Sequence, residues 1–221
     1  MQNIPIFTAA NGLASLVLRE IPYSGRAYVM IRSVWNDAVT ALVQECASFC
    51  RMAGAETVYV SQDCKDLPFP HAYDMVELDC RREDLPPQTE TVKLEPLTAD
   101  RAEEWCSVYN RCFLPIAGAA AYDRREMNRL LKEHTAFLVT KDGVCAAIVE
   151  GKPDGLAAIG VLPEYRGMGT AVALAALQKV QSSVLTVRTA STNQRALAMY
   201  EKLGFRQKQI VSRWWLAETK E

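Results

Sequence analysis

Apolar residues recur along this chain with two periods, and each period predicts one kind of element. Alternating or short β-branched runs predict strands at 27–32, 56–61, 73–79, 91–97, 136–140, 144–150, 156–161, 184–189 and 205–217. Apolar spacings of three and four residues predict helices over 35–52, 99–112, 123–134, 169–181 and 192–204. Asp123 is expected to cap one helix at its start, and Gly204 to end the last one. The chain therefore belongs to the α/β class.

The order of these elements predicts two domains. After residue 90 they follow one another as β-α-α-β-β-β-α-β-α-β, whereas the first half holds a shorter β-α-β-β series. A charged segment with a Pro-Pro pair, residues 81–90, is the best linker candidate between them. We expect a smaller α/β module over residues 1–86 and a larger domain over residues 87–221.

The amino-acid composition argues against some binding partners and some cellular compartments. The 221 residues include 25 basic and 26 acidic ones, so a net charge of −1 offers no overall attraction for nucleic acid or an anionic membrane. Seven cysteines occur without a Cys-x-x-Cys pair, which indicates free thiols in a reducing compartment rather than disulfides or a metal site. No signal peptide and no apolar run of about 20 residues is evident. We expect a cytoplasmic protein without a metal.

The segment "GVLPEYRGMGTAVALAAL", residues 160–177, carries the most specific chemistry. The start of a helix has amide N–H groups without intrahelical partners and a partial positive charge, both of which favour a phosphate. Gly167 and Gly169 leave those amides accessible, and Arg166 adds a positive charge. Thr170 offers a hydroxyl donor, and Ala171 keeps the first turn slim. A dinucleotide loop would place its glycines directly after the strand, and a P-loop needs Gly-Lys-Ser/Thr, so neither pattern fits.

This segment resembles the acetyl-CoA pyrophosphate loop of the GCN5-related N-acetyltransferases, whose pattern is Arg/Gln-x-x-Gly-x-Gly/Ala. Positions of that loop and of the family's next motif are filled by Arg166, Gly169, Ala171, Asn193, Ala196, Met199, Tyr200, Gly204 and Phe205. The resemblance covers residues 91–216. It implies the GNAT fold, an α/β architecture of the α+β type with a mixed central sheet flanked by helices. Chains of this family can hold two copies of the fold, one of them degenerate, and residues 27–80 of the module 1–86 could be such a half-GNAT repeat. No glycine lies between strand 27–32 and its helix, so we expect no CoA site there.

The family resemblance also implies a function and a cofactor. It predicts an acetyl-CoA-dependent N-acetyltransferase that moves the acetyl group to a primary amine of a small molecule or peptide by direct attack. The cofactor would contact Ile159, Gly160, Val161, Arg166, Gly167, Met168, Gly169, Thr170, Ala171 and Asn193. A non-catalytic acyl-CoA-binding regulatory module is the alternative. The first module would supply packing, a wall of the acceptor pocket or the surface of a homodimer.

Roles in proton transfer are less well defined by the sequence. The resemblance makes Tyr200 the proton donor to the CoA thiolate, although its helix face also suits a core aromatic. Glu150 and Asp154 are candidates for the base, yet neither stands in the family's register, and ordered water or bulk solvent serves equally well. Arg188 occupies a position where relatives carry Glu, so it would bind a substrate carboxylate or lie at the surface. The apolar loop 112–124 is expected to shape the acceptor pocket.

Overall fold

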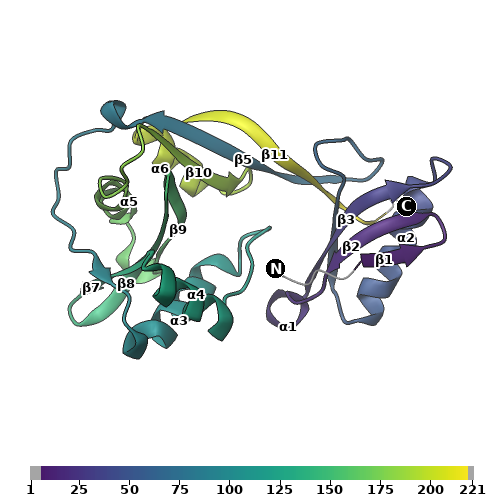
Figure 1. Ribbon diagram of the computed structural model, residues 1–221, viewed down its shortest axis with the longest axis horizontal. Helices are drawn as coiled ribbons and strands as arrows, with labels where there is room; N and C mark the ends of the chain where they lie inside the picture. Colours follow the sequence, from purple (N-terminus) through teal and green to yellow (C-terminus); the bar gives the residue numbers. More distant parts are fainter. Residues whose placement is uncertain (1–5, 219–221) are drawn as a thin grey trace. The chain divides into compact units, whose positions relative to one another are not determined.

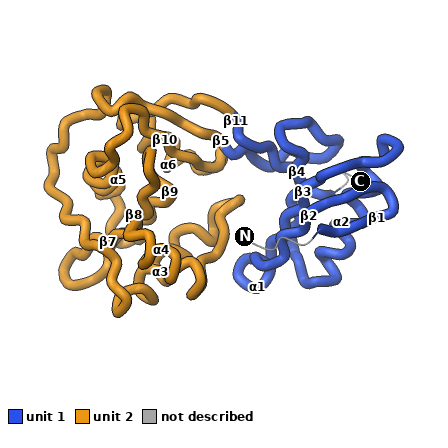
Figure 2. Tube along the Cα trace, viewed as in Figure 1, with its two compact units in different colours: residues 1–75, 210–221 blue, residues 76–209 orange. Residues whose placement is uncertain are grey.

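The structure is a computed structural model that describes residues 6–218, and these form two compact units (Figures 1 and 2). Unit 1 comprises residues 1–75 and 210–221, and unit 2 comprises residues 76–209. This division differs from the boundary expected at residue 86. The reason is one long strand, β5 (His71–Arg81), whose second half lies in the sheet of unit 2.

Unit 1 is a sheet with one long helix against it. Its strands follow the order β1-β2-β3-β4-β11. Its elements are β1 (Ile6–Ala9), β2 (Gly12–Val17), the short α1 (Ile21–Ser24), β3 (Arg26–Val34), α2 (Val39–Met52), β4 (Thr57–Ser61) and the end of β11 (Arg206–Leu216). Strands β3 and β4 are parallel, so β3-α2-β4 is a crossover unit, as the alternation of strand, helix and strand predicts.

The core of unit 1 explains why α2 forms where it does. Leu42, Val43 and Cys46 recur at helical spacing and are fully buried against the inward residues of β3 and β4. Alternation along β3 sends the neighbouring residues to the opposite face of the sheet, where Tyr28 stacks on Tyr59 with ring centroids 5.4 Å apart. Cys46 and Cys50, both fully buried in this core, therefore serve as small core residues.

Unit 2 is a mixed sheet with helices on both faces. Its strands follow the order β11-β5-β10-β9-β8-β7-β6, antiparallel from β6 to β9 and parallel between β9 and β10. Its elements along the chain are η1 (Arg82–Asp84), β6 (Glu95–Pro96), η2 (Ala99–Arg101), α3 (Ala102–Phe113), α4 (Arg124–Glu133), β7 (Ala136–Lys141), β8 (Val144–Lys152), β9 (Gly155–Val161), η3 (Pro163–Tyr165), α5 (Gly169–Leu177), β10 (Val184–Ala190) and α6 (Gln194–Lys202). The predicted element order from β6 to β11 is confirmed.

Helices α3 and α5 pack on opposite faces of β8 and β9. A Cβ placed on Gly160 would lie 3.0 Å from Cβ of Cys112, on α3, whereas one placed on Gly169, the first residue of α5, would lie 3.8 Å from Val161. Because consecutive strand residues face opposite ways, residues 160 and 161 mark the two faces. Both helices therefore meet the sheet beside the C-terminal end of β9.

Local signals account for most element boundaries. Asp123 caps α4 in a capping box with Glu126, and Gly204 ends the last helix turn with φ 93°. The hairpin of β1 and β2, whose turn precedes Gly12, is not predicted above, although Asn-Gly is a turn signal. The strand expected over 91–97 shrinks to two residues.

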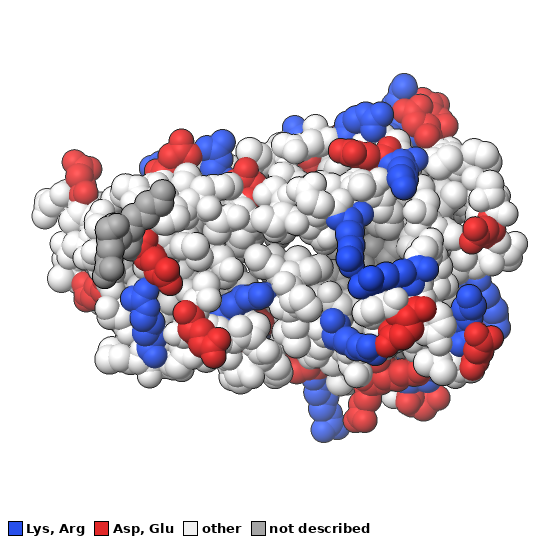
Figure 3. Space-filling view, turned by 180° about the vertical axis from the view of Figure 1, so that it is seen from behind, with Lys and Arg blue, Asp and Glu red and all other residues white. Residues whose placement is uncertain are grey.

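Surface properties agree with the composition. Basic and acidic side chains lie interspersed on the face shown in Figure 3. Among residues 6–218, no helix has the length and apolarity needed to cross a membrane. All seven cysteines are free thiols.

Candidate active site

Strands β9 and β10 separate after a single point of pairing. β9 pairs with β8 along its whole length, from Gly155 opposite Lys152 to Val161 opposite Ala147. On its other side β9 is in register with β10 only where Thr186 lies opposite Gly155. Toward the C-terminal ends the strands diverge, which leaves the main-chain groups on the β10 side of 159–161 open to an added, strand-like ligand.

Polar contacts connect β9 and β10 at the point where the two strands still pair. The Thr186 hydroxyl donates to the Asp154 carboxylate at 2.7 Å, the Thr186 amide donates to the Asp154 carbonyl at 2.7 Å, and Lys152 lies 3.2 Å from the same carboxylate. The hydrogen bond from Thr186, and next the one from Lys152, lower the pKa of Asp154. A Cβ on Gly155 would lie 1.9 Å from the Thr186 carbonyl oxygen, so only glycine permits this approach. Asp154 thus ties the two strands together.

The loop before α5 presents main-chain donors. The first hydrogen bond within the helix runs from the Val172 amide to the Met168 carbonyl at 3.0 Å. The amides of Gly169, Thr170 and Ala171 precede it and have no intrahelical acceptor. Gly167 adopts φ 103°, a left-handed conformation that glycine adopts without strain. The helix start is therefore shaped to receive an anion.

A cavity of about 530 Å³ lies over the diverging strands and this helix start. Eight of the ten predicted cofactor residues line it: Ile159, Gly160, Val161, Arg166, Gly167, Gly169, Thr170 and Asn193. Met168 and Ala171 do not line it. Further lining residues come from the end of α3, the segments after α3 and β9, and one face of α6: Arg111, Cys112, Phe113, Pro115, Ile116, Pro163, Arg195, Ala196 and Met199. The spacing of Asn193, Ala196 and Met199 could have identified the α6 face from sequence.

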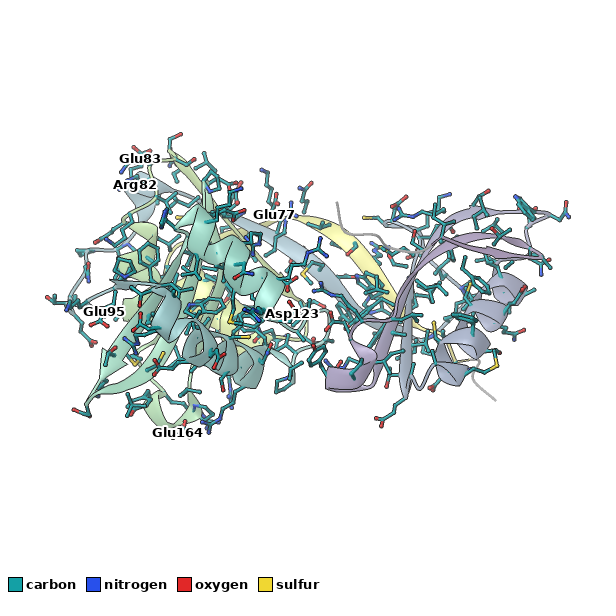
Figure 4. All side chains as sticks on the ribbon, turned by 60° about the horizontal axis from the view of Figure 1, so that its bottom comes forward. Glu77, Arg82, Glu83, Glu95, Asp123 and Glu164 are labelled. Atoms are coloured by element: carbon teal, nitrogen blue, oxygen red, sulfur yellow. The ribbon has the colours of Figure 1, made fainter. Side chains whose placement is uncertain are left out.

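The cavity carries more positive than negative charge. Three guanidinium groups line it, those of Arg111, Arg166 and Arg195. Arg111 forms an ion pair with Glu164, labelled in Figure 4, and the Glu164 backbone amide and Arg111 lower the pKa of that carboxylate. The side chains of Arg166 and Arg195 form no hydrogen bond or ion pair with any of residues 6–218. The cavity thus suits a polyanionic ligand.

Asn193, the N-cap of α6, and Tyr200, on α6, differ in their relation to the cavity. Asn193 lines the cavity and also caps α6, because its side-chain oxygen accepts from the Ala196 amide at 3.3 Å. Tyr200 is only 5% exposed and does not line the cavity, and its ring centroid lies 5.6 Å from that of Phe205. Its hydroxyl makes no hydrogen bond within the described chain. Burial raises the pKa of Tyr200, so the phenol keeps its proton.

Glu150 is held in a buried polar network instead of lining the cavity. Its side chain is buried on β8, accepting from the Tyr122 hydroxyl at 2.7 Å and from Arg129 at 2.8 Å. Burial is the main cause that raises the pKa of Tyr122, and electrostatic interactions with Tyr109 and with this carboxylate add to it. Each carboxylate oxygen already has a donor, which makes Glu150 a structural residue of the α4 side.

Arg188 also has a protein partner. Its Nε and Nη2 both donate to one oxygen of Glu77 on β5, at 2.9 and 2.7 Å, and Gln209 donates to the other oxygen at 3.0 Å (Figure 4 labels Glu77). The hydrogen bond from Arg188 is the main cause that lowers the pKa of Glu77. Arg188 does not line the cavity, so a substrate carboxylate would have to displace Glu77.

Solved structures share the fold of this chain. A GCN5-related N-acetyltransferase from Sphaerobacter thermophilus superimposes with a TM-score of 0.58 at 16% identity, over 94% of this chain and 77% of that one. A tandem GNAT protein from the clavulanic acid biosynthesis pathway gives 0.54 at 16%, over 96% and 80%. A protein of unknown function from Staphylococcus epidermidis gives 0.58 at 10%, over 98% and 94%. At such identities the likeness shows the fold. A search of curated protein sequences gave no match.

A family match indicates acyl-CoA-dependent acetyltransferase activity in general. Residues 102–205, just under half of the chain, match the family model described as Acetyltransferase (GNAT) family. The chain therefore carries a GNAT acetyltransferase domain, and the family resemblance and the fold class expected from the sequence are confirmed. The matched segment includes both the loop before α5 and the whole of α6.

Proposed function

We propose that this protein transfers the acetyl group of acetyl-CoA to a primary amine of a small-molecule or peptide acceptor by direct attack of that amine. One observation carries the proposal: a single cavity joins the open edge of β9, the amides at the start of α5 that have no intrahelical acceptor, and two guanidinium groups without a hydrogen-bond or ion-pair partner among residues 6–218. The open strand edge suits the amide-rich arm of an acyl-CoA, the helix-start amides suit its diphosphate, and the guanidinium groups suit its negative charge.

Each part of the cavity has a separate task. Acetyl-CoA supplies a thioester as the activated acyl donor. The amides of Gly169, Thr170 and Ala171, with Arg166, would hold the diphosphate. The open edge of 159–161 would pair with the amide-rich arm, and an amide near Val161 would stabilise the carbonyl oxygen as negative charge develops on it.

Proton transfer needs a donor for the leaving thiolate and an acceptor for the amine proton. We assign the first role to Tyr200 because it fills the family's proton-donor position on α6. Tyr200 itself does not line the cavity, but it directly follows Met199, which does, and its hydroxyl makes no hydrogen bond with residues 6–218. Glu150 and Asp154 are poor bases, since donors of the protein already occupy their carboxylates. We therefore propose that the amine loses its proton through water.

Binding and turnover test the proposal separately. Acetyl-CoA at 100 times its Kd should raise the free energy of unfolding by about 2.7 kcal/mol, seen as a rise in Tm. Thiol release should then appear with at least one member of a panel of primary amines. Stabilisation by CoA without release across the panel would favour the regulatory module, and the absence of any stabilisation would refute an acyl-CoA site.

The substitution Tyr200→Phe tests the assigned proton donor. The ring keeps its contact with Phe205, so stability and acetyl-CoA affinity should stay close to those of the unmodified protein. The turnover number should fall by about 10²–10⁴-fold, the usual effect of losing a general acid. A turnover number that stays unchanged would remove Tyr200 from the mechanism and leave solvent as the proton donor.

A further inference from the structure

The three arginines around the cavity are not equivalent. Arg111 is already paired with Glu164, whereas Arg166 belongs to the loop that leads into α5. Arg195 is exposed at the start of α6, lines the cavity and has no hydrogen bond or ion pair with residues 6–218. A phosphate bound at the α5 helix start and Arg166 would leave the charge of Arg195 unmatched.

The position of Arg195 follows from the helix that carries it. Met199 lies four residues later on the same face of α6, and its sulfur is 3.4 Å from the place a Cβ on Gly169 would take. Four residues span about 6 Å along a helix axis. Arg195 therefore stands about one turn beyond the level of Gly169, toward the N-terminal end of α6. A second phosphate, next to one held on the amides of 169–171, would come within reach of it.

Coenzyme A carries two kinds of phosphate. Its diphosphate is the group assigned above to the start of α5, and its ribose bears a separate 3′-phosphate monoester. Such a monoester has a charge of about −1.5 to −2 at pH 7 and three acceptor oxygens, which suit a guanidinium group. We propose that Arg195 binds this 3′-phosphate and makes the domain select CoA over dephospho-CoA, which lacks it. The inference rests on the proposed function, because it needs CoA in this cavity.

Titration calorimetry at one fixed ionic strength tests the assignment with CoA and dephospho-CoA as the two probes. The unmodified protein should bind CoA about tenfold or more tightly than dephospho-CoA, the value of one hydrogen-bonded charge pair. Arg195→Gln should raise the Kd of CoA to that of dephospho-CoA and leave the Kd of dephospho-CoA unchanged. Arg195→Lys, which keeps the charge, should retain part of the preference.

Two further variants separate this role from general attraction of anions. Arg166→Gln should raise the Kd values of both probes by a similar factor, since both contain the diphosphate. Arg124→Gln changes an exposed arginine on α4 that does not line the cavity, and should alter neither Kd. Equal binding of the two probes to the unmodified protein, or an equal loss of both in Arg195→Gln, would overturn the inference alone. Failure of both probes to bind would overturn the proposed function, and this inference with it.

Discussion

Gly169 allows the ligand-binding role of the loop to be separated from its structural role. A Cβ on this residue would lie 3.4 Å from the Met199 sulfur and 3.8 Å from Val161. Both are ordinary contacts, the methionine side chain is flexible, and Gly169 lies within α5 without a left-handed φ. Alanine in place of glycine favours a helix by at most about 1 kcal/mol. Gly169→Ala should therefore fold with a free energy of unfolding between 0 and about 1 kcal/mol higher.

Ligand affinity should change in the opposite direction. The added methyl group would face the cavity at the point where the amides of 169–171 must reach a phosphate. Loss of one charge-assisted hydrogen bond costs about 1.5–3 kcal/mol. At 1.4 kcal/mol for each factor of ten, the Kd for CoA should rise about 10–100-fold.

Urea unfolding and titration calorimetry on the same protein samples measure the two effects. Gly151→Ala is the matched control, because its Cβ would meet only the Thr135 carbonyl oxygen at 3.5 Å and Gly151 does not line the cavity. The control should bind CoA normally. Normal CoA binding by Gly169→Ala would refute the helix-start site, and a loss of 1 kcal/mol or more of stability would show that the glycine is required for packing.

Two further predictions concern Glu150 and Arg188, whose roles the sequence left ambiguous. Tyr122→Phe removes one of the two donors to buried Glu150 and should lower the free energy of unfolding by about 1–3 kcal/mol in urea titrations, whereas an unchanged value would show that water replaces the hydroxyl. Because Arg188 lowers the pKa of Glu77 in the folded protein, that pair should stabilise the fold above the unfolded pKa of about 4.3 and lose its effect as the pH falls through the lower folded value. Arg188→Gln should therefore destabilise the protein at pH 7 and have a diminishing effect below about pH 4 in chemical denaturation. If the difference in free energy of unfolding between Arg188→Gln and the unmodified protein does not depend on pH, the pairing of Arg188 with Glu77 is contradicted.

Much of the fold of unit 2 could be predicted because its signals are local. Asp142 and Gly143 both take positive φ, as the hairpin turn requires, and Asp123 begins α4 through its own capping box. The loop before α5 was equally evident, since its arginine and two glycines lie within four consecutive residues, 166–169. Such features depend on residues a few positions apart, so periodicity and turn chemistry suffice to find them.

Features that depend on distant partners could not be predicted. Arg188 meets Glu77, which is 111 positions away, so an arginine that looks free in the sequence is paired in the structure. Glu150 has the residue type of a base, but its donors Tyr122 and Arg129 come from the segment before α4 and from α4 itself. Alternation also predicts the strand over 73–79 without saying which strands pair with it.

Strand β5 lies between β10 and β11, so it matters where a fragment that contains the family domain begins. A fragment that starts after the charged Pro-Pro segment would contain every residue of the matched family domain and still lack this strand. Its sheet would have two exposed inner edges, and unpaired edges of that kind invite self-association. The sheet of the GNAT domain is therefore completed by residues that precede the matched segment.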